Sequence, residues 1–142
     1  ARPALRLLRG AGLLTGVVTN QPGVARGSVA PDRLEAVHAR VDALLGPFDV
    51  WQACTHAEDA GCPCRKPRPG LVRAAAEALG LSPAQCAVVG DTRADLEAAL
   101  AAGALPVLVP NGRTRRAEVS AAPAVARDLT EAARLVLEGG RP

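Results

Sequence analysis

Hydrophobic residues along the chain follow two alternating patterns, one typical of helices and one typical of buried strands. Helical spacing is clearest in the segment 31–45, which opens with Pro31 and stops at Gly46-Pro47. Short aliphatic runs predict strands at residues 13–19, 48–53, 86–89 and 104–109. Further helices are predicted around residues 5–8, 69–79, 96–100 and 132–137. Strands that alternate with helices predict an α/β fold, a parallel sheet with helices on both faces.

Polar residues follow three of these strands directly. They are Thr19-Asn20 after the first strand, a Cys/His segment with Lys66 after the second, and Asp91 with Asp95 after the third. In parallel sheets, ligands bind beyond the carboxyl ends of the strands. We therefore expect these groups to meet at one edge of the sheet.

Composition and charge limit the function classes. A chain of 142 residues that is 49% hydrophobic can build one core, so residues 1–142 are expected to form a single domain. Phe48 and Trp51 are the only Phe and Trp of the chain, which has no Tyr, so few side chains could stack on nucleic-acid bases. The net charge is only +3. The tight cluster of Arg113, Arg115 and Arg116 reads as a solvated surface, so no nucleic-acid partner is expected. The absence of a long apolar run or leader, together with free thiols, indicates a cytoplasmic protein without a membrane partner.

The segment 54–64 carries four soft metal ligands in two pairs. Cys54 and His56 are separated by one residue, and so are Cys62 and Cys64. Three thiolates and an imidazole suit tetrahedral Zn²⁺, and four protein ligands leave no open position, which indicates a structural site. The alternatives are buried structural thiols and a disulfide framework. Cys86 lies apart in an apolar run, where core packing is expected.

Three further signals fit phosphate chemistry. A hydroxyl and free backbone N–H groups at Thr19-Asn20 can hold phosphate oxygens, although such residues are also common in turns. Lys66 offers a point charge, although a lone lysine is usually solvated. Asp91 and Asp95 suit Mg²⁺, although either could cap or decorate a helix. Together, the three signals favour metal-assisted phosphoryl transfer.

In combination, these motifs resemble the haloacid dehalogenase (HAD) superfamily. The resemblance rests on residues 17–27 (VVTNQPGVARG), on the Cys-x-His and Cys-x-Cys-Arg-Lys-Pro stretch, and on Val88-Val89-Gly90-Asp91-x-x-x-Asp95. Within the superfamily, the chain is most similar to the zinc-containing D-glycero-D-manno-heptose 1,7-bisphosphate phosphatases and histidinol-phosphate phosphatases. The resemblance implies a Rossmann-like three-layer fold and a phosphoric monoester hydrolase that requires Mg²⁺, with a small phosphorylated sugar or histidinol phosphate as substrate.

The resemblance also implies roles for individual residues. Thr19 becomes the phosphate-binding hydroxyl, with Asn20 beside it at the substrate. Lys66 neutralises the transferring phosphoryl group, and Arg65 contacts the substrate or its second phosphate. Gln21 and Arg26 are weaker candidates for the same pocket.

The metal ligands follow from the same resemblance. Asp91 becomes the Mg²⁺ ligand, and Asp95 becomes a second ligand or the carboxylate that orients the site. The zinc ligands are those of the loop 54–64, which would hold a substrate-facing segment.

Two departures from the family pattern affect the expected activity. Thr92 stands where bisphosphatase relatives often carry a lysine, which weakens the assignment of substrate. The family's Asp-x-Asp-Gly-Thr motif, which supplies the nucleophile and the general acid and base, is absent, and no aspartate precedes Asp32. We therefore expect a truncated fold that lacks the first, central strand, with a slot between the strands ending at Thr19 and Val89. The chain alone is expected to be inactive, and the alternative is a non-catalytic zinc-stabilised binding module or decayed fragment.

Overall fold

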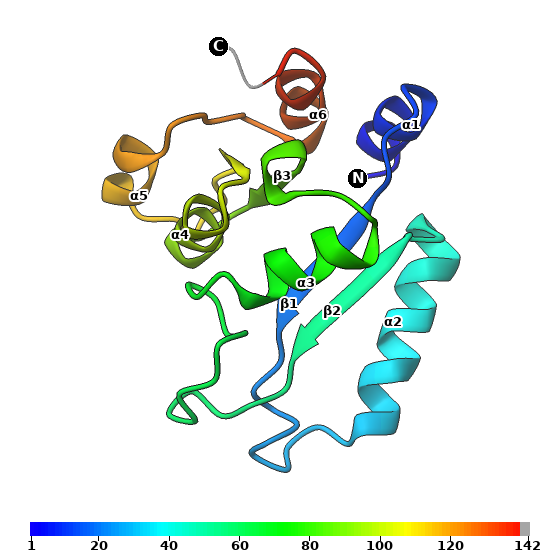
Figure 1. The fold of residues 1–142 in the computed structure, drawn as a ribbon, viewed down its shortest axis with the longest axis vertical. Coiled ribbons are helices and arrows are strands. Elements are labelled where there is room, and N and C mark those ends of the chain that lie inside the picture. Colours follow the sequence, from blue (N-terminus) through cyan, green and yellow to red (C-terminus); the bar gives the residue numbers. More distant parts are fainter. Residues whose placement is uncertain (140–142) are drawn as a thin grey trace.

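The structure is a computed structural model, and it describes residues 1–139 of the chain. Figure 1 shows short parallel strands surrounded by helices. The strands are β1 (Gly16–Asn20), β2 (Val50–Cys54), β3 (Ala87–Gly90) and β4 (Leu105–Leu108). The helices are α1 (Arg2–Gly10), α2 (Pro31–Leu45), α3 (Gly70–Ala78), α4 (Arg93–Ala102), α5 (Arg116–Ala121) and α6 (Leu129–Leu137). A short 3₁₀ turn at Pro83–Gln85 leads into β3.

The strands form two parallel pairs and not one continuous sheet. β1 pairs with β2 in a register that places Thr19 opposite Ala53, and β3 pairs with β4 with Gly90 opposite Leu108. Within residues 1–139, β1 and β3 each have a strand partner on one edge only. The prediction of parallel α/β strands is confirmed, and the division agrees with the slot expected between the first and third strands.

Helices join the two strand pairs. α3 packs on β1 and β2, α4 packs on β3 and β4, and the two helices contact each other. Apolar contacts follow the same plan: Val72 of α3 lies in one cluster with Ala98 and Ala99 of α4. At the upper end of the molecule in Figure 1, α1 contacts α6. The two halves are therefore connected through helices, whereas β1 and β3 share no ladder.

Element boundaries differ from the sequence prediction at the first strand. Leu13 does not extend the strand, because its N–H donates to the carbonyl of Leu8 and completes the end of α1. Thr15 also lies outside the strand and is held by Asp49, whose carboxylate accepts from the Thr15 N–H at 2.7 Å. β1 therefore begins at Gly16.

The boundaries of α2 and α3 agree closely with the sequence prediction, whereas α1, α4 and α6 begin three residues earlier than predicted. α2 spans the expected segment and ends before its C-cap Gly46, and α4 ends before its C-cap Gly103, which has the left-handed φ of 87° that glycine adopts without strain. The sequence analysis missed α5, a helix of six residues.

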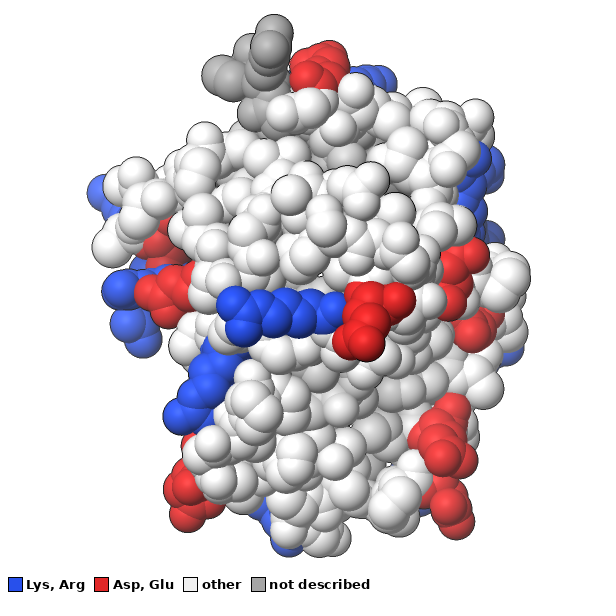
Figure 2. All heavy atoms as spheres, in the orientation of Figure 1, with Lys and Arg blue, Asp and Glu red and all other residues white. Residues whose placement is uncertain are grey.

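Acidic and basic side chains are interspersed on the face drawn in Figure 2, with broad uncharged areas between them. None of the helices in the described residues has the length and hydrophobicity that crossing a bilayer requires.

Candidate functional site

The end of β1 is fastened to the segment that carries Lys66. The Asn20 side chain donates from Nδ2 to the Lys66 carbonyl at 3.1 Å, and its Oδ1 accepts from the Lys66 N–H at 3.0 Å. Both polar atoms of the amide are therefore used in holding the backbone of Lys66, 46 residues away in the sequence. Beside it, Gln21 Nε2 donates to Thr19 Oγ1 at 3.0 Å. The structure thus brings together four of the residues that the sequence analysis placed in the phosphate site, namely Thr19, Asn20, Gln21 and Lys66.

The Lys66 ammonium lies between the two strand pairs. Its Nζ donates to the Val18 carbonyl of β1 at 3.2 Å and to Asp95 Oδ1 of α4 at 2.6 Å. Asp95 Oδ2 accepts from the backbone N–H groups of Asp91 and Thr92, at 3.2 and 3.1 Å. One carboxylate therefore links Lys66 to the loop after β3.

Ionisation of Asp95 is favoured by these contacts. Burial disfavours the carboxylate, but the hydrogen bond and charge of Lys66 and the donors of Thr92 outweigh it and lower the pKa of Asp95. Thr92 also caps α4, because its hydroxyl accepts from the Asp95 N–H and donates to Asp95 Oδ2. This capping role gives a structural reason for a threonine at that position.

Gly90 makes room for the Asp95 carboxylate. A Cβ at Gly90 would collide with the carboxyl group of Asp95. The Gly-Asp pair at the end of β3 therefore has two roles. Gly90 leaves space for the Asp95 carboxylate, and Asp91 places a second carboxylate at the strand end.

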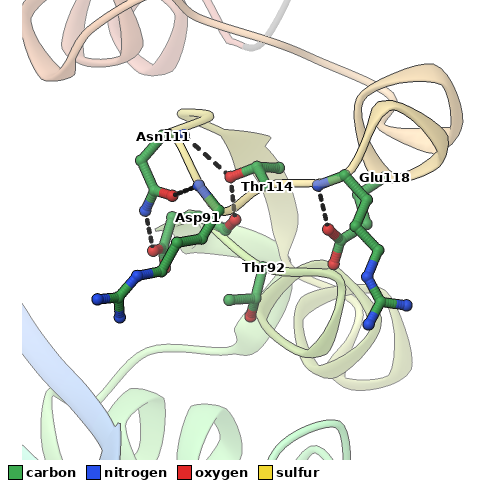
Figure 3. Close-up of a pocket in the computed structure, with 7 residues that line it drawn as sticks. Asp91, Thr92, Asn111, Thr114 and Glu118 are labelled. Carbon is green, nitrogen blue, oxygen red and sulfur yellow. Dashed lines mark hydrogen bonds between the residues drawn. The ribbon is translucent and has the colours of Figure 1, made fainter.

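Asp91 is exposed and is held by the loop after β4, a contact that the sequence analysis missed. Asn111 Nδ2 donates to Asp91 Oδ2 at 2.5 Å, and Thr114 Oγ1 donates to the Asp91 carbonyl at 2.9 Å. Figure 3 shows both contacts. The sequence held a weak signal for this contact, since Asn111 lies in the polar segment that begins three residues after β4 ends, at the same edge as Asp91.

The four predicted zinc ligands meet in one place. Their donor atoms all lie within 4.8 Å of one another. Cys54 Sγ lies 3.6 Å from Cys62 Sγ and 3.4 Å from His56 Nδ1, and Cys64 Sγ lies 3.2 Å from the same nitrogen. Tetrahedral Zn²⁺ with its usual bond lengths separates its donors by about 3.5–3.8 Å. The residues therefore fit a closed Zn²⁺ site by donor type and by spacing.

The crowding of the thiols separates their pKa values. Burial opposes ionisation of Cys62, but hydrogen bonds from the Arg65 backbone and from the Cys64 and Cys54 thiols lower its pKa to about 6. Burial and the neighbouring sulfurs of Cys54 and Cys62 raise the pKa of Cys64 to about 12. Three thiolates cannot form together without a compensating charge, and a divalent cation supplies that charge.

The arginines around this loop have different environments. Arg68 Nη1 donates to the Cys62 carbonyl at 2.5 Å and braces the loop. Arg26 forms an ion pair with Glu58, which joins the loop after β1 to the zinc loop. Arg65 differs from both, because its Nη1 is buried and has no hydrogen-bond partner among residues 1–139. The substrate roles predicted for Arg26 and Arg65 stay predictions.

Parallel α/β strands with a lysine and aspartates at their carboxyl ends form a site typical of Rossmann-like enzymes that handle phosphate. A family model described as HAD-like hydrolase matches residues 63–132. The D-glycero-β-D-manno-heptose-1,7-bisphosphate 7-phosphatase of Pseudomonas putida is 46% identical over 117 residues, and the enzyme of that name from Pseudomonas aeruginosa is 42% identical over 114 residues. The crystal structure of D,D-heptose 1,7-bisphosphate phosphatase from B. bronchiseptica, complexed with magnesium and phosphate, superposes with a TM-score of 0.82 at 36% identity. The chain belongs to the HAD superfamily and, within it, to the family of these heptose bisphosphate phosphatases.

The matches cover a larger share of this chain than of its relatives. The matches cover 80% and 78% of this chain but 67% and 64% of the two Pseudomonas proteins. The B. bronchiseptica structure is matched over 96% of this chain and 80% of its own. The chain thus spans about two thirds of the curated relatives.

Proposed function

We propose that the chain carries the substrate and metal half of a Mg²⁺-dependent phosphatase that acts on a small sugar bisphosphate, such as D-glycero-D-manno-heptose 1,7-bisphosphate. Family membership supports the reaction class, and the names of the relatives support the substrate class. The proposal treats Thr19, Lys66 and Asp91 as the centre of the site.

The observation that carries the proposal is the placement of Lys66. Its ammonium is held by the Val18 carbonyl of β1 and by Asp95 in the first turn of α4, close to the carboxyl ends of β1 and β3, where phosphate ligands bind in folds of this kind. A fixed positive charge lowers the barrier of phosphoryl transfer because it meets the charge that develops on the transferring group. Asn20 fixes the backbone of the same residue, so the charge is positioned before substrate arrives.

Arg65 supports a second contact to the substrate. Its Nη1 is a buried donor without a partner among the described residues, and leaving such a donor unpaired is costly. Because this nitrogen is inaccessible to solvent in the structure, a substrate oxygen would satisfy it after the guanidinium turns outward. Arg65 is covalently adjacent to Lys66, so both groups can act on one ligand.

The two aspartates fit Mg²⁺ unequally. Both carboxylate oxygens of Asp95 already accept hydrogen bonds, which suits the carboxylate that orients the site. Asp91 is exposed, and only its Oδ2 has a hydrogen-bond partner among residues 1–139, which suits a metal ligand. Mg²⁺ held by one carboxylate and by phosphate oxygens would neutralise charge on the substrate. We assign Asp91 to that role and Asp95 to positioning Lys66.

Zinc in this proposal has a structural role. The four ligands of the loop 54–64 close the coordination shell, so Zn²⁺ would fix the loop and leave the chemistry to other groups. The loop leads directly into Arg65 and Lys66. Zinc would therefore position both side chains at the substrate.

We propose further that the 142-residue chain alone does not turn substrate over. The family's Asp-x-Asp-Gly-Thr motif is not among its residues. The proposal assigns Asp91 to Mg²⁺, and Asp95 already accepts from Lys66 and from two backbone N–H groups, so no carboxylate of the site is left to form the phosphoryl intermediate. The groups that remain can still bind phosphate.

Binding of inorganic phosphate tests the proposed function. The zinc-loaded chain with Mg²⁺ is titrated with phosphate and followed by ³¹P NMR, together with the Lys66→Ala and Asp91→Asn variants. We expect saturable binding that is weakened in both variants. Binding that is equal in the unmodified chain and in Lys66→Ala would contradict the proposed site.

A further inference from the structure

The loop that follows β4 holds Asp91 at two points. Asn111 Nδ2 donates to the Asp91 carboxylate at Oδ2, and Thr114 Oγ1 donates to the Asp91 carbonyl. One contact orients the carboxylate, and the other fixes the backbone that carries it (Figure 3). Among residues 1–139, Asp91 Oδ1 has no hydrogen-bond or ion-pair partner. The two oxygens of this carboxylate are therefore unequal, because only Oδ2 is engaged.

Hydrogen bonds within the loop keep the Asn111 side chain in place. Its Oδ1 accepts from the Arg113 N–H at 2.8 Å, so both polar atoms of the carboxamide are engaged. The Asn111 N–H donates to Thr114 Oγ1 at 2.9 Å, and the Asn111 carbonyl accepts from the Thr114 N–H at 3.1 Å. The carboxamide is therefore oriented before any ligand binds, and such preorganisation lowers the entropy cost of binding.

The far end of the loop is anchored to α4. Glu118 Oε2 accepts from the Arg115 N–H at 2.7 Å, and its Oε1 accepts from the Arg93 N–H at 2.9 Å. Arg93 begins α4 shortly after Asp91 in the chain. The loop after β4 and the segment that carries Asp91 are thus joined on both sides of the Asn111 contact.

A carboxylate with one engaged oxygen discriminates between divalent cations. Mg²⁺ is small, demands near-ideal octahedral geometry and suits a carboxylate that binds through one oxygen. Ca²⁺ is larger, takes more oxygen ligands and tolerates a carboxylate that binds through both oxygens. The Asn111 carboxamide is uncharged, so it engages Asp91 Oδ2 without neutralising the charge that attracts the cation.

We propose that Asn111 determines the metal specificity of Asp91. By engaging Oδ2, it restricts the carboxylate to binding through Oδ1 and raises the preference for Mg²⁺ over Ca²⁺. Thr114 is a positioning residue, because its hydroxyl holds both the Asn111 N–H and the Asp91 carbonyl. Hydrogen bonds to a ligating side chain orient it and change the affinity of the metal. The inference rests on the proposed function, which assigns Asp91 to Mg²⁺.

The test compares Mg²⁺ and Ca²⁺ binding to the zinc-loaded 142-residue chain. Each chloride salt is titrated at constant ionic strength without phosphate, and the NMR shifts of the Asp91 and Thr92 amides give the dissociation constants. Asn111→Leu keeps the approximate size of the side chain and removes the donor. We expect it to lower the ratio of the Ca²⁺ to the Mg²⁺ dissociation constant about tenfold, as for other lost partners of metal ligands.

Two comparisons accompany this variant. Gln85→Leu is the matched control, because it also removes an exposed carboxamide, but at the start of β3, and its ratio should be that of the unmodified chain. Should Asn111→Leu not fold, Thr114→Val removes the hydroxyl that holds the loop to Asp91, and Thr114→Ser retains it. We then expect the ratio to fall in Thr114→Val and to stay unchanged in Thr114→Ser.

The Asp91→Asn variant separates this inference from the proposed function. If Asp91→Asn abolishes Mg²⁺ binding but the ratio is unchanged in Asn111→Leu, Asn111 does not determine specificity and the function stands. If both dissociation constants rise by the same factor in Asn111→Leu, its role is merely structural and the inference is wrong. If Asp91→Asn binds Mg²⁺ as the unmodified chain does, the role that the proposed function gives to Asp91 fails, and the inference fails with it.

Discussion

Lys66 and Asp95 form an ion pair in which both side chains are nearly buried, with the ammonium 2.6 Å from the carboxylate and exposed fractions of 13% and 10%. The other ion pairs of residues 1–139 are more exposed, such as Arg93 with Glu97 at 73% and 41%. Screening by water weakens the exposed pairs, whereas the buried pair cannot lose one partner without leaving a desolvated charge.

Removal of the Lys66 charge should destabilise the fold. We expect Lys66→Ala to lower the free energy of unfolding by about 3 kcal/mol, because the Asp95 carboxylate stays buried without its counter-ion. Urea denaturation of the zinc-loaded protein measures the change. The control is Arg93→Ala, which breaks the exposed pair with Glu97 and should cost less than about 0.5 kcal/mol. Equal losses in the two variants would contradict the difference in burial.

Stability should depend on pH through Asp95. Its pKa is lowered in the folded state, so its contribution is complete above the unfolded value of about 3.9 and is lost as the pH falls through the folded value. We therefore expect Asp95→Asn to be less stable than the unmodified protein at neutral pH, and the difference to shrink below about pH 4. Acid titration of both proteins under identical metal conditions measures this difference. A gap that widens on acidification would contradict the assigned direction.

Zinc binding should require the cysteines of the loop 54–64 and should not require Cys86. Elemental analysis should find about one Zn²⁺ per chain, as one four-ligand shell holds one ion. Cys62→Ser combined with Cys64→Ser should abolish zinc binding. Cys86→Ser is the matched control, since Cys86 lies outside the cluster and its thiol hydrogen-bonds the Ser82 carbonyl. Retention of zinc in the double variant would exclude the predicted site.

A methyl group at Gly90 should lower the stability of the fold. The added Cβ of Gly90→Ala would collide with the Asp95 carboxyl group, and we expect a loss of about 1–3 kcal/mol, as for other overpacked positions. Gly10→Ala is the control, because a Cβ there meets no atom within 4 Å. Thermal unfolding of the two variants measures the difference. A neutral Gly90→Ala would show that Asp95 can move without cost.

The chain alone should release no phosphate from a sugar bisphosphate. The reason is chemical, since no residue among the 142 supplies the family's nucleophilic aspartate. A colorimetric phosphate assay with Mg²⁺ present measures turnover. Metal-dependent release that disappears in Asp91→Asn would overturn the expectation.

Sequence reasoning was most successful where local chemistry decides the structure. Pro31 and Gly46 bound α2 as expected, and the one-residue spacing within the Cys54/His56 and Cys62/Cys64 pairs was sufficient to predict the donor cluster. It failed for α5, whose six residues are too few for a helical period to be recognised. The first strand was placed too early, because Leu13 and Thr15 are aliphatic or β-branched but are held by α1 and Asp49.

The sequence predicted a set of residues for the site but not the contacts among them. Thr19, Lys66 and Asp91 could be predicted because a hydroxyl, an ammonium and a carboxylate suit phosphate and Mg²⁺ binding. The sequence did not indicate that both polar atoms of the Asn20 amide hydrogen-bond the Lys66 backbone, or that Arg26 forms an ion pair with Glu58. Such pairings depend on segments that are distant in the chain, so only the tertiary structure reveals them.

The position of Lys66 has a practical consequence. It is the only lysine of the sequence, and its amine spans the two strand pairs that no backbone ladder connects in the described chain. An amine-reactive label can therefore modify only this side chain and the amino terminus. Labelling at Lys66 requires its amine to leave the Val18 carbonyl and the Asp95 carboxylate, so the labelling rate reports how often these two contacts open.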